Sequence, residues 1–173
     1  VVIPESVECI GAGAFRGWTS LKSVVIPEGI ERIACGTFMG CISLQSVVIP
    51  SNVKNIDIQA FSGCTNLQSV VISDGVERIA SEAFKDCRSL ESVVIPDGVT
   101  SMENSAFRGC KSLASIVIPE GIERIACGTF MGCISLQSVV IPSNVKNIDI
   151  QTFYGCTNLQ SVVISDGVER IAS

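Results

Sequence analysis

The segment Gly36–Pro50 reads GTFMGCISLQSVVIP, and the same fifteen residues recur without change at Gly128–Pro142. The identity extends over Val25–Gln59 and Val117–Gln151, an offset of 92 residues without a gap. An active site is one constellation in which each residue has its own role, so an enzyme gains little from a verbatim copy of a long stretch. A stacked scaffold gains from such a copy.

A shorter period of 23 residues underlies this duplication, because four units of 23 make 92. Seven units account for 161 of the 173 residues, and the remaining 12 begin an eighth. Repetition at this period without insertions is the signature of a solenoid whose coils stack on one another, so residues 1–173 are predicted to form a single array. The period is visible in all seven phenylalanines, which are Phe15, Phe38, Phe61, Phe84, Phe107, Phe130 and Phe153.

The first half of each unit reads as a strand. In Leu44–Ile49 the spacing L-x-x-V-x-I places Leu44, Val47 and Ile49 inward, while Ser46 and Val48 point outward. Pro50 lacks the N–H group that a strand ladder needs and ends the pairing. We therefore expect parallel strands near residues 46–49, 69–72, 92–95, 115–118 and 138–141, stacked at about 4.8 Å per coil.

The second half of the unit reads as a short strand followed by a helical turn. Val53–Ile56 is predicted to be the strand, with Val53 and Ile56 inward. Phe61 follows as a core residue, and Gly63 suits the end of a helical turn. The predicted fold class is a repeat solenoid, mainly β with short helical turns.

The columns of this repeat resemble those of a known family. VVIPSNVKNIDIQAFSGCTNLQS, residues 47–69, resembles the BspA-like or Treponema-type leucine-rich repeat, and the pattern covers the whole sequence. The resemblance implies a curved, right-handed leucine-rich repeat array with a concave parallel β-sheet. It also implies a cell-surface or secreted location and a role in adhesion or in binding host proteins. The departures are Trp18 in the Cys column, Ser73 and Ser165 in the Pro column and Asp86 in the Gly column.

Composition excludes several classes of partner. A net charge of −5 leaves no basic excess to neutralise a phosphate backbone, so no nucleic-acid partner is expected. Pro, Ser, Gly or a charge interrupts every apolar run before the roughly 18 residues of a membrane helix, so no membrane insertion is expected. The chain begins Val-Val-Ile-Pro without an initiator Met, and we interpret it as a fragment of a longer chain.

Nine cysteines raise the question of a metal site or a disulfide framework. The sequence has no His and no C-x-x-C spacing, so we expect neither a metal nor a cofactor. An odd total prevents complete pairing within one chain, and small apolar thiols are commonly buried. Reduced, buried thiols are therefore predicted for the six cysteines that share one column: Cys41, Cys64, Cys87, Cys110, Cys133 and Cys156.

The charged residues do not indicate catalysis. Glu31 and Glu77 share a column with Lys54, so neighbouring coils alternate in sign, as cross-strand ion pairs do. Without His there is no Ser-His or Cys-His pair, and no phosphate-binding G-x-x-x-x-G-K loop occurs. The chain is predicted not to be an enzyme.

The outward positions of the main strand are the candidate binding residues. They form an uncharged, partly apolar strip, and contiguous apolar strips often mark interaction surfaces. The alternative is that β-branched residues simply stabilise strands. The candidate residues are Ser46, Val48, Ser69, Val71, Ser92, Val94, Ser115, Val117, Ser138 and Val140.

The leading hypothesis is a non-catalytic binding or adhesion module whose strip meets a protein or glycan, with avidity from repetition. A structural spacer or stalk is the alternative, because the units vary at the turn, as Met39, Ser62 and Lys85 show, rather than on the strip. The near-identical halves also keep an engineered, consensus-like repeat open. End-to-end self-association is expected as well, because neither terminal unit resembles a polar cap and edge strands pair readily.

Overall fold

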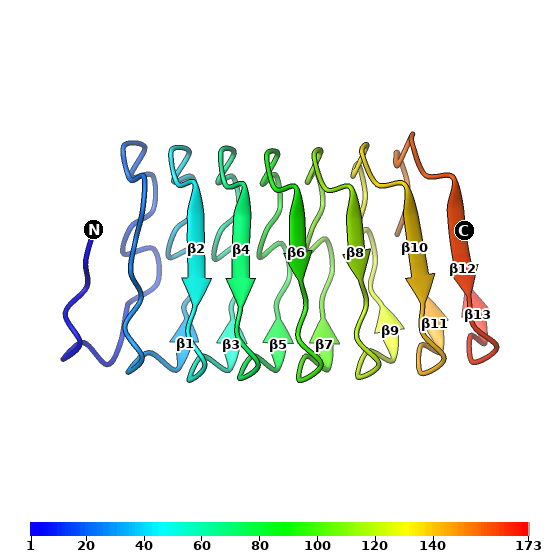
Figure 1. Ribbon diagram of the computed structural model, residues 1–173, viewed down its shortest axis with the longest axis horizontal. Helices are drawn as coiled ribbons and strands as arrows, with labels where there is room; N and C mark the ends of the chain where they lie inside the picture. Colours follow the sequence, from blue (N-terminus) through cyan, green and yellow to red (C-terminus); the bar gives the residue numbers. More distant parts are fainter. Residues whose placement is uncertain (173) are drawn as a thin grey trace.

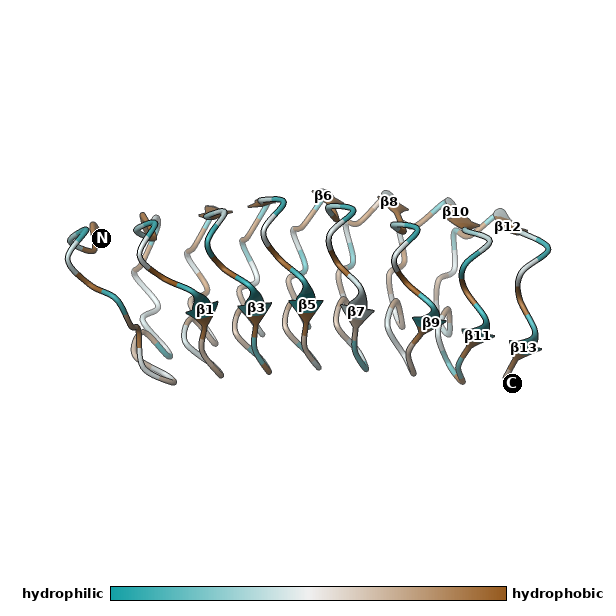
Figure 2. Cartoon of the chain, turned by 90° about the horizontal axis from the view of Figure 1, so that it is seen from below, coloured by the Kyte–Doolittle hydropathy of each residue, from teal (hydrophilic) through white to brown (hydrophobic). Residues whose placement is uncertain are grey.

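The computed structural model describes residues 1–172, which form one row of stacked coils (Figure 1). In each coil the chain descends through a front strand, returns upward behind it and steps toward the C-terminal end of the row (Figure 1). This winding is right-handed, the usual sense for connections between parallel strands. Seen from below, the row is nearly straight with a slight bow (Figure 2). The predicted solenoid is confirmed.

The front of the row is a six-stranded parallel sheet, called here the main sheet. Residues that face one another are 23 positions apart, as in Val48 and Val71, so the sequence period sets the register. The alternation of exposed and buried residues in SVVI matches the predicted pattern. The strands are β2 (Ser46–Ile49), β4 (Ser69–Ile72), β6 (Ser92–Val94), β8 (Ser115–Val117), β10 (Ser138–Ile141) and β12 (Ser161–Ile164).

The predicted strand ranges agree with the structure to within one residue. β6 and β8 end one position earlier than expected, at Val94 and Val117. Their pairing does not extend to Ile95 and Ile118, and between β8 and β10 it is reduced to Ser115 with Ser138. The array is therefore looser at this step.

Two-residue strands form a second face of the coil. They divide into two parallel sheets, and β7 and β9 are not paired, next to the loose step of the main sheet. Each strand except the last directs one apolar side chain, such as Ile56 or Ile79, into the core, whereas Ile171 of the last strand is exposed. The strands are β1 (Arg32–Ile33), β3 (Asn55–Ile56), β5 (Arg78–Ile79), β7 (Ser101–Met102), β9 (Arg124–Ile125), β11 (Asn147–Ile148) and β13 (Arg170–Ile171).

The third face consists of turns rather than the expected short helical turns. Within residues 1–172 no helix forms here, and none long and apolar enough to span a bilayer occurs. Gly36 and Gly40 have φ values of +61° and +73°, which interrupt a right-handed helix. Between them the N–H of Phe38 donates to the carbonyl of Ala60 in the next coil at 2.8 Å. We call the set of such bonds between neighbouring coils the turn ladder.

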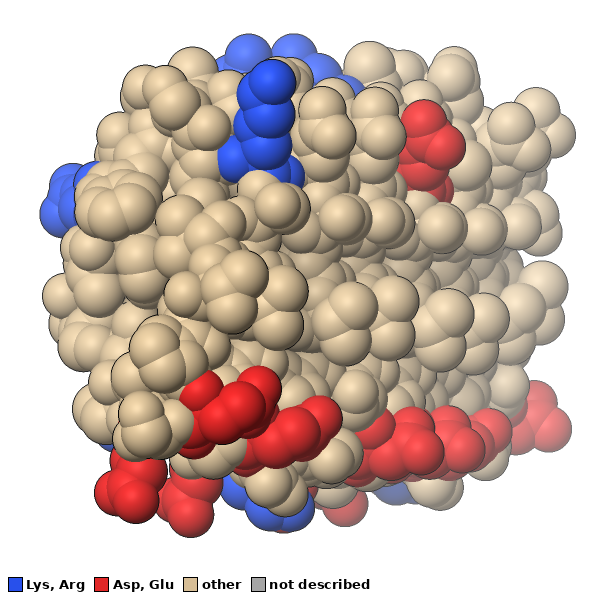
Figure 3. Space-filling view, turned by 60° about the vertical axis from the view of Figure 1, so that its left-hand side comes forward, with Lys and Arg blue, Asp and Glu red and all other residues tan. Residues whose placement is uncertain are grey.

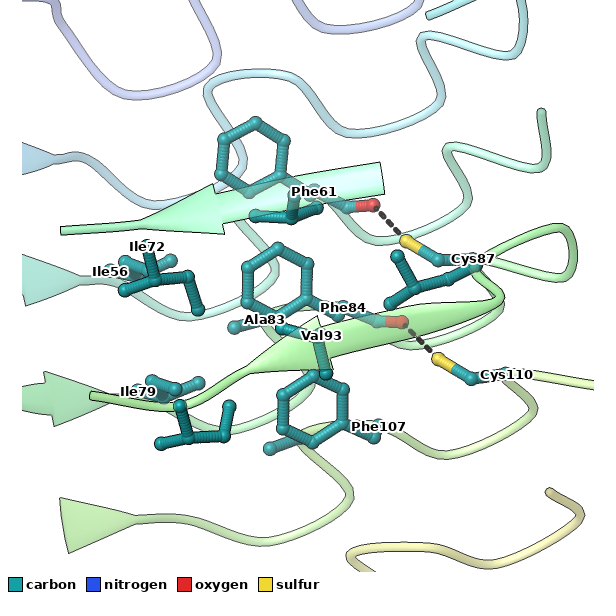
Figure 4. Packing of buried hydrophobic residues seen from close by; sticks show 14 of the residues in the cluster. Ile56, Phe61, Ile72, Ile79, Ala83, Phe84, Cys87, Val93, Phe107 and Cys110 are labelled. Atoms are coloured by element: carbon teal, nitrogen blue, oxygen red, sulfur yellow. Dashed lines mark hydrogen bonds between the residues drawn. The ribbon is translucent and has the colours of Figure 1, made fainter. Parts of the chain in front are cut away.

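Stacked phenylalanines fill the centre of the coils (Figure 4). The ring centroids of Phe61 and Phe84 lie 5.4 Å apart, as do those of Phe84 and Phe107, and the rings are nearly parallel. All three side chains are fully buried. At the N-terminal end, Trp18 packs edge-on against Phe15, with their ring centroids 5.0 Å apart. Trp18 therefore partly covers the first ring of the column.

Gly75 and Gly167 are required by a close approach of two coils. A Cβ atom on Gly75 would lie 1.6 Å from the carbonyl oxygen of Ser51 in the preceding coil, whereas one on Gly29 would lie 3.4 Å from the carbonyl oxygen of Val7. We expect Gly75→Ala to lower the free energy of unfolding in urea by about 1–3 kcal/mol, the usual cost of overpacking. Gly29→Ala is the matched control and is expected to change it by less than about 1 kcal/mol. Equal effects of the two substitutions would contradict the contact.

Candidate binding face

The main sheet brings the ten predicted residues onto one continuous surface, called here the Val–Ser face. Ser46 lies beside Ser69, and Val48 beside Val71, and the coils as far as Ser115 and Val117 repeat the arrangement, while Ser138 pairs with Ser115 at the loose step. The strands place these side chains outward because their neighbours Val47 and Ile49 are held in the core. No pairing within residues 1–172 covers this face.

The Val–Ser face combines methyl groups with free hydroxyls. The exposed fractions are 58% for Val48, 55% for Val71, 75% for Val94, 75% for Val117 and 58% for Val140. The serines are exposed too, and within residues 1–172 none of their hydroxyls bonds to another side chain or to the backbone. A partner can therefore gain both apolar contact and hydrogen bonds here.

Acidic side chains form a row along one edge of this face (Figure 3). Each follows directly after the Pro or Ser that ends a main-sheet segment, and all are exposed. Within the described residues none takes part in an ion pair. The charge that recurs at these positions in six of the eight units was not recognised in the sequence. We call them the acidic edge: Glu5, Glu28, Asp74, Asp97, Glu120 and Asp166.

Many charges on the second face are paired instead. The predicted alternation of Glu and Lys gives a contact between Lys54 and Glu77 at 3.5 Å. Shorter pairs run diagonally, such as Arg78 with Glu103 at 2.6 Å. The sequence signal for them, an arginine and a carboxylate separated by one unit plus two residues, was missed. These pairs link neighbouring coils across the second face.

The column of cysteines is buried as predicted, and all nine thiols are free. The Sγ–H of Cys87 donates to the carbonyl of Phe61 at 3.2 Å, and Cys110 donates to that of Phe84 (Figure 4). Burial raises the pKa of Cys64 and Cys133 from 9.0 to about 12. It raises the pKa of Cys87 and Cys110 well above the same value. A protonated thiol is a poor nucleophile and a poor metal ligand.

We expect Cys64, Cys87, Cys110 and Cys133 to react with a thiol reagent only after unfolding, because they are buried and protonated. Cys9 and Cys35 are exposed and are expected to react in the native protein, which makes them internal controls. Peptide mapping after labelling with and without urea distinguishes the two sets. Rapid native labelling of the four buried thiols would contradict their placement.

A cleft of ≈ 560 Å³ lies where β7 and β9 separate. Part of its polar lining is already engaged: Glu103 accepts bonds from the backbone N–H and the hydroxyl of Ser81, both at 3.0 Å, and Arg124 donates to Asp149, outside the lining, at 2.7 Å. Residues 1–172 contain no cluster of three metal-ligating side chains. The cleft is therefore a weaker candidate site than the Val–Ser face.

Comparisons with known proteins identify relatives over the entire chain. A family described as the BspA type leucine-rich repeat region matches six copies, over residues 1–113 and 77–173. A leucine-rich repeat protein from Bacteroides ovatus is 31% identical, with a TM-score of 0.94 over 100% of this chain and 47% of that one. The chain therefore spans about half the length of that protein.

Two further structures share the fold. A leucine-rich repeat protein from T. pallidum is 31% identical, with a TM-score of 0.81 over 99% of this chain and 72% of that one. The pneumococcal vaccine antigen PcpA is 20% identical, with a TM-score of 0.60 over 99% of this chain and 55% of that one. A comparison with curated protein sequences finds no match.

Proposed function

Because the chain belongs to the BspA-type leucine-rich repeat family, we propose that it is a non-catalytic binding or adhesion module that docks a protein or glycan on its Val–Ser face. The proposal places the module at a cell surface or in a secreted protein, as the resemblance to this family implies. The observation that carries it is the row of five valines, from Val48 to Val140, each more than half exposed in consecutive coils.

Exposure of this kind is costly for a protein without a partner. Covering apolar surface is worth roughly 25 cal/mol per Å², so a ligand that covers several of these valines gains binding free energy. The flat, uncharged centre of the face presents no side chain that must first lose an ion pair. Repetition of the same two side chains favours ligands that contact several coils at once.

A spacer or stalk is the second candidate. It is favoured by the variation at the turn face, where Met39, Ser62, Lys85, Arg108, Met131 and Tyr154 occupy one column. In a stalk the valines serve only to stabilise strands. The two functions make different predictions for substitutions that preserve the strand.

A binding screen separates the two candidates. The native chain and a variant with Val71→Thr, Val94→Thr, Val117→Thr and Val140→Thr are tested against a displayed peptide library and a glycan array. Thr retains the β-branched shape but adds a hydroxyl to the surface. Ligands that bind the native chain and lose at least tenfold in affinity for the variant support the proposal. A screen without ligands, or with ligands indifferent to the variant, favours the stalk.

A further inference from the structure

We propose that the partner of the Val–Ser face is a cationic amphipathic helix, which lies along the valine row and directs Lys or Arg side chains at the acidic edge. This inference rests on the proposed function and specifies the ligand of the same face. Three features carry it: the single sign of the acidic edge, the spacing of the coils and the absence of aromatic side chains on the face.

The acidic edge is complementary to a basic partner. Asp74, Asp97 and Glu120 follow one another in consecutive coils, at about the 4.8 Å spacing of the strands. Like charges at this distance repel one another, and the described residues supply no cation to any of the three. The acids beside the second face differ, since Asp57, Glu103 and Asp149 each pair with an arginine.

The opposite edge of the face has no such bias. Lys22, Glu91 and Lys111 are all exposed near the beginnings of the main-sheet segments, so charges of both signs occur there. Basic and acidic side chains are accordingly both present along the upper edge in Figure 3, while a row of acidic side chains runs along the lower edge. A partner with one basic flank therefore has one preferred orientation.

The spacing of the coils favours a helix over an extended strand. Along the row, valines recur at about 4.8 Å, which is close to the 5.4 Å pitch of an α-helix. Alternate side chains of an extended peptide recur at about 6.6 Å and lose register with the row within a few coils. The five valines from Val48 to Val140 span about 19 Å, the length of roughly 13 helical residues.

The width of the face fits the same partner. Asp74 lies three positions after Val71 along the chain, which corresponds to about 10 Å for an extended backbone. A helix with side chains is about 10–12 Å wide, so an apolar stripe on the valines brings one flank over the acidic edge. A lysine or arginine on that flank can reach the carboxylates while its aliphatic stem covers apolar surface.

The residues of the face also favour protein over glycan. Within the described chain the exposed aromatic side chains are Trp18 and Tyr154, and both belong to the turn segments. Stacking of a sugar ring on an aromatic platform is therefore not available on the Val–Ser face. The acids disfavour nucleic acid, because they repel its phosphates.

The inference is tested with three designed peptides of about 18 residues, a length chosen to exceed the roughly 13 residues that cover the valine row. One carries a Leu stripe with Lys flanks, the second has Glu in place of Lys, and the third is a scrambled sequence of the first. Fluorescence anisotropy gives the Kd of each at about 50 and about 300 mM salt, where screening lengths differ. We expect the Lys peptide to bind at least tenfold more tightly than either of the others, with affinity that falls as salt rises.

Two variants of equal charge locate the effect. Asp74→Asn, Asp97→Asn and Glu120→Gln together should weaken binding of the Lys peptide at least tenfold and reduce its salt dependence. The matched control, Glu8→Gln, Glu31→Gln and Glu123→Gln, removes three exposed, unpaired acids outside the acidic edge and should change Kd by less than twofold. Thermal unfolding of both variants checks that they fold.

The outcomes separate this inference from the proposed function. Equal binding of the Lys and Glu peptides, or equal effects of the two triple variants, would overturn the cationic helix. If ligands from the peptide screen still lose affinity for the valine variant, the proposed function stands without the cationic helix. Ligands found only on the glycan array would also overturn the helix. If every ligand binds the native chain and the valine variant equally well, both the cationic helix and the proposed function are contradicted.

Discussion

Replacing Phe84 by Ala is expected to lower the free energy of unfolding by about 3–5 kcal/mol, the usual range for deleting a buried aromatic side chain. Phe84 is fully buried and stacks between Phe61 and Phe107 with centroid distances of 5.4 Å on both sides. The rigid ladders of the two adjoining coils limit collapse into the cavity. Urea unfolding followed by circular dichroism measures the change.

Position in the column supplies the control. Phe15 lies at the N-terminal end of the stack and is only partly buried, so Phe15→Ala should cost less than half as much. Phe84→Leu should recover most of the loss, because it refills the cavity with apolar atoms. If Phe84→Ala leaves unfolding unchanged, the phenylalanine column is not the core.

Alkaline pH is expected to unfold the protein through its thiols. Burial raises the pKa of Cys64 and Cys133 to about 12 and shifts Cys87 and Cys110 in the same direction, whereas an unfolded thiol titrates near 9.0. Above pH 9 the unfolded chain therefore holds fewer protons than the native chain, and stability falls as pH rises. The contribution of these buried, protonated thiols to the free energy of unfolding is fully present below pH 9 and is lost between about pH 9 and 12.

The expected slope is steep. Each fully buried thiol contributes at most about 1.4 kcal/mol per pH unit in this window, so four contribute about 5 kcal/mol per unit. Domains of this kind are stable by about 5–15 kcal/mol, which places alkaline unfolding within roughly one to three units above pH 9. Urea midpoints measured from pH 7 to 11 should be constant at first and then decrease sharply.

Cysteine variants isolate the thiols from other groups that titrate at high pH. Cys87→Ala combined with Cys110→Ala should lower the slope by about a third to a half, because Cys64 and Cys133 remain, as do Cys41 and Cys156, whose pKa is also raised by burial. Cys35→Ala removes an exposed thiol and should leave the slope unchanged. Parallel pH profiles for the native chain and the double variant would show that thiol burial does not govern alkaline stability.

The main sheet and the core were predictable because the sequence samples one pattern many times. A single SVVI segment could belong to a strand in either orientation, but its recurrence 23 residues later requires parallel pairing of like residues, as Val48 with Val71 shows. The outward direction of the ten candidate residues followed from the same alternation. Their membership of one surface is therefore a consequence of periodicity.

The turn face was not predictable in the same way. Gln59 and Glu82 adopt φ values of +57° and +58°, in the column where Gly36 has +61°. Residue type does not specify this conformation, since glutamine and glutamate rarely adopt it. Bonds to the next coil, such as Gln59 N–H to the carbonyl of Ser81 at 3.1 Å, compensate for its cost. A helical turn was the local expectation, and contacts between coils overrode it.

Charge was predicted only in part for a related reason. Residues in the same column pair directly across coils, and the contact of Lys54 with Glu77 followed from that rule. The diagonal contact of Arg78 with Glu103 depends on side-chain length and direction, which a column comparison does not contain. The recurring acidic residues were visible in the sequence, but only the structure shows that they lie beside the exposed valines of the Val–Ser face.

The turn ladder gives the molecule an electrical polarity. In each coil the peptide units ending at residues equivalent to Gln59, Phe61 and Gly63 direct their carbonyls toward the preceding coil and their N–H groups toward the next. Three units per coil, each with a dipole of about 3.5 D, sum to about 10 D per coil because all point the same way. The strands of the two β faces lack such an alignment.

The array is thus negative toward its N-terminal end and positive toward its C-terminal end, opposite to an α-helix. The moment grows with each added coil, so dielectric relaxation should record a larger moment than a β-sandwich of equal mass. Two such arrays stacked head to tail would align their moments and match carbonyls with N–H groups, whereas head-to-head neighbours would oppose both. A filament assembled in this way would have two different ends, one negative and one positive.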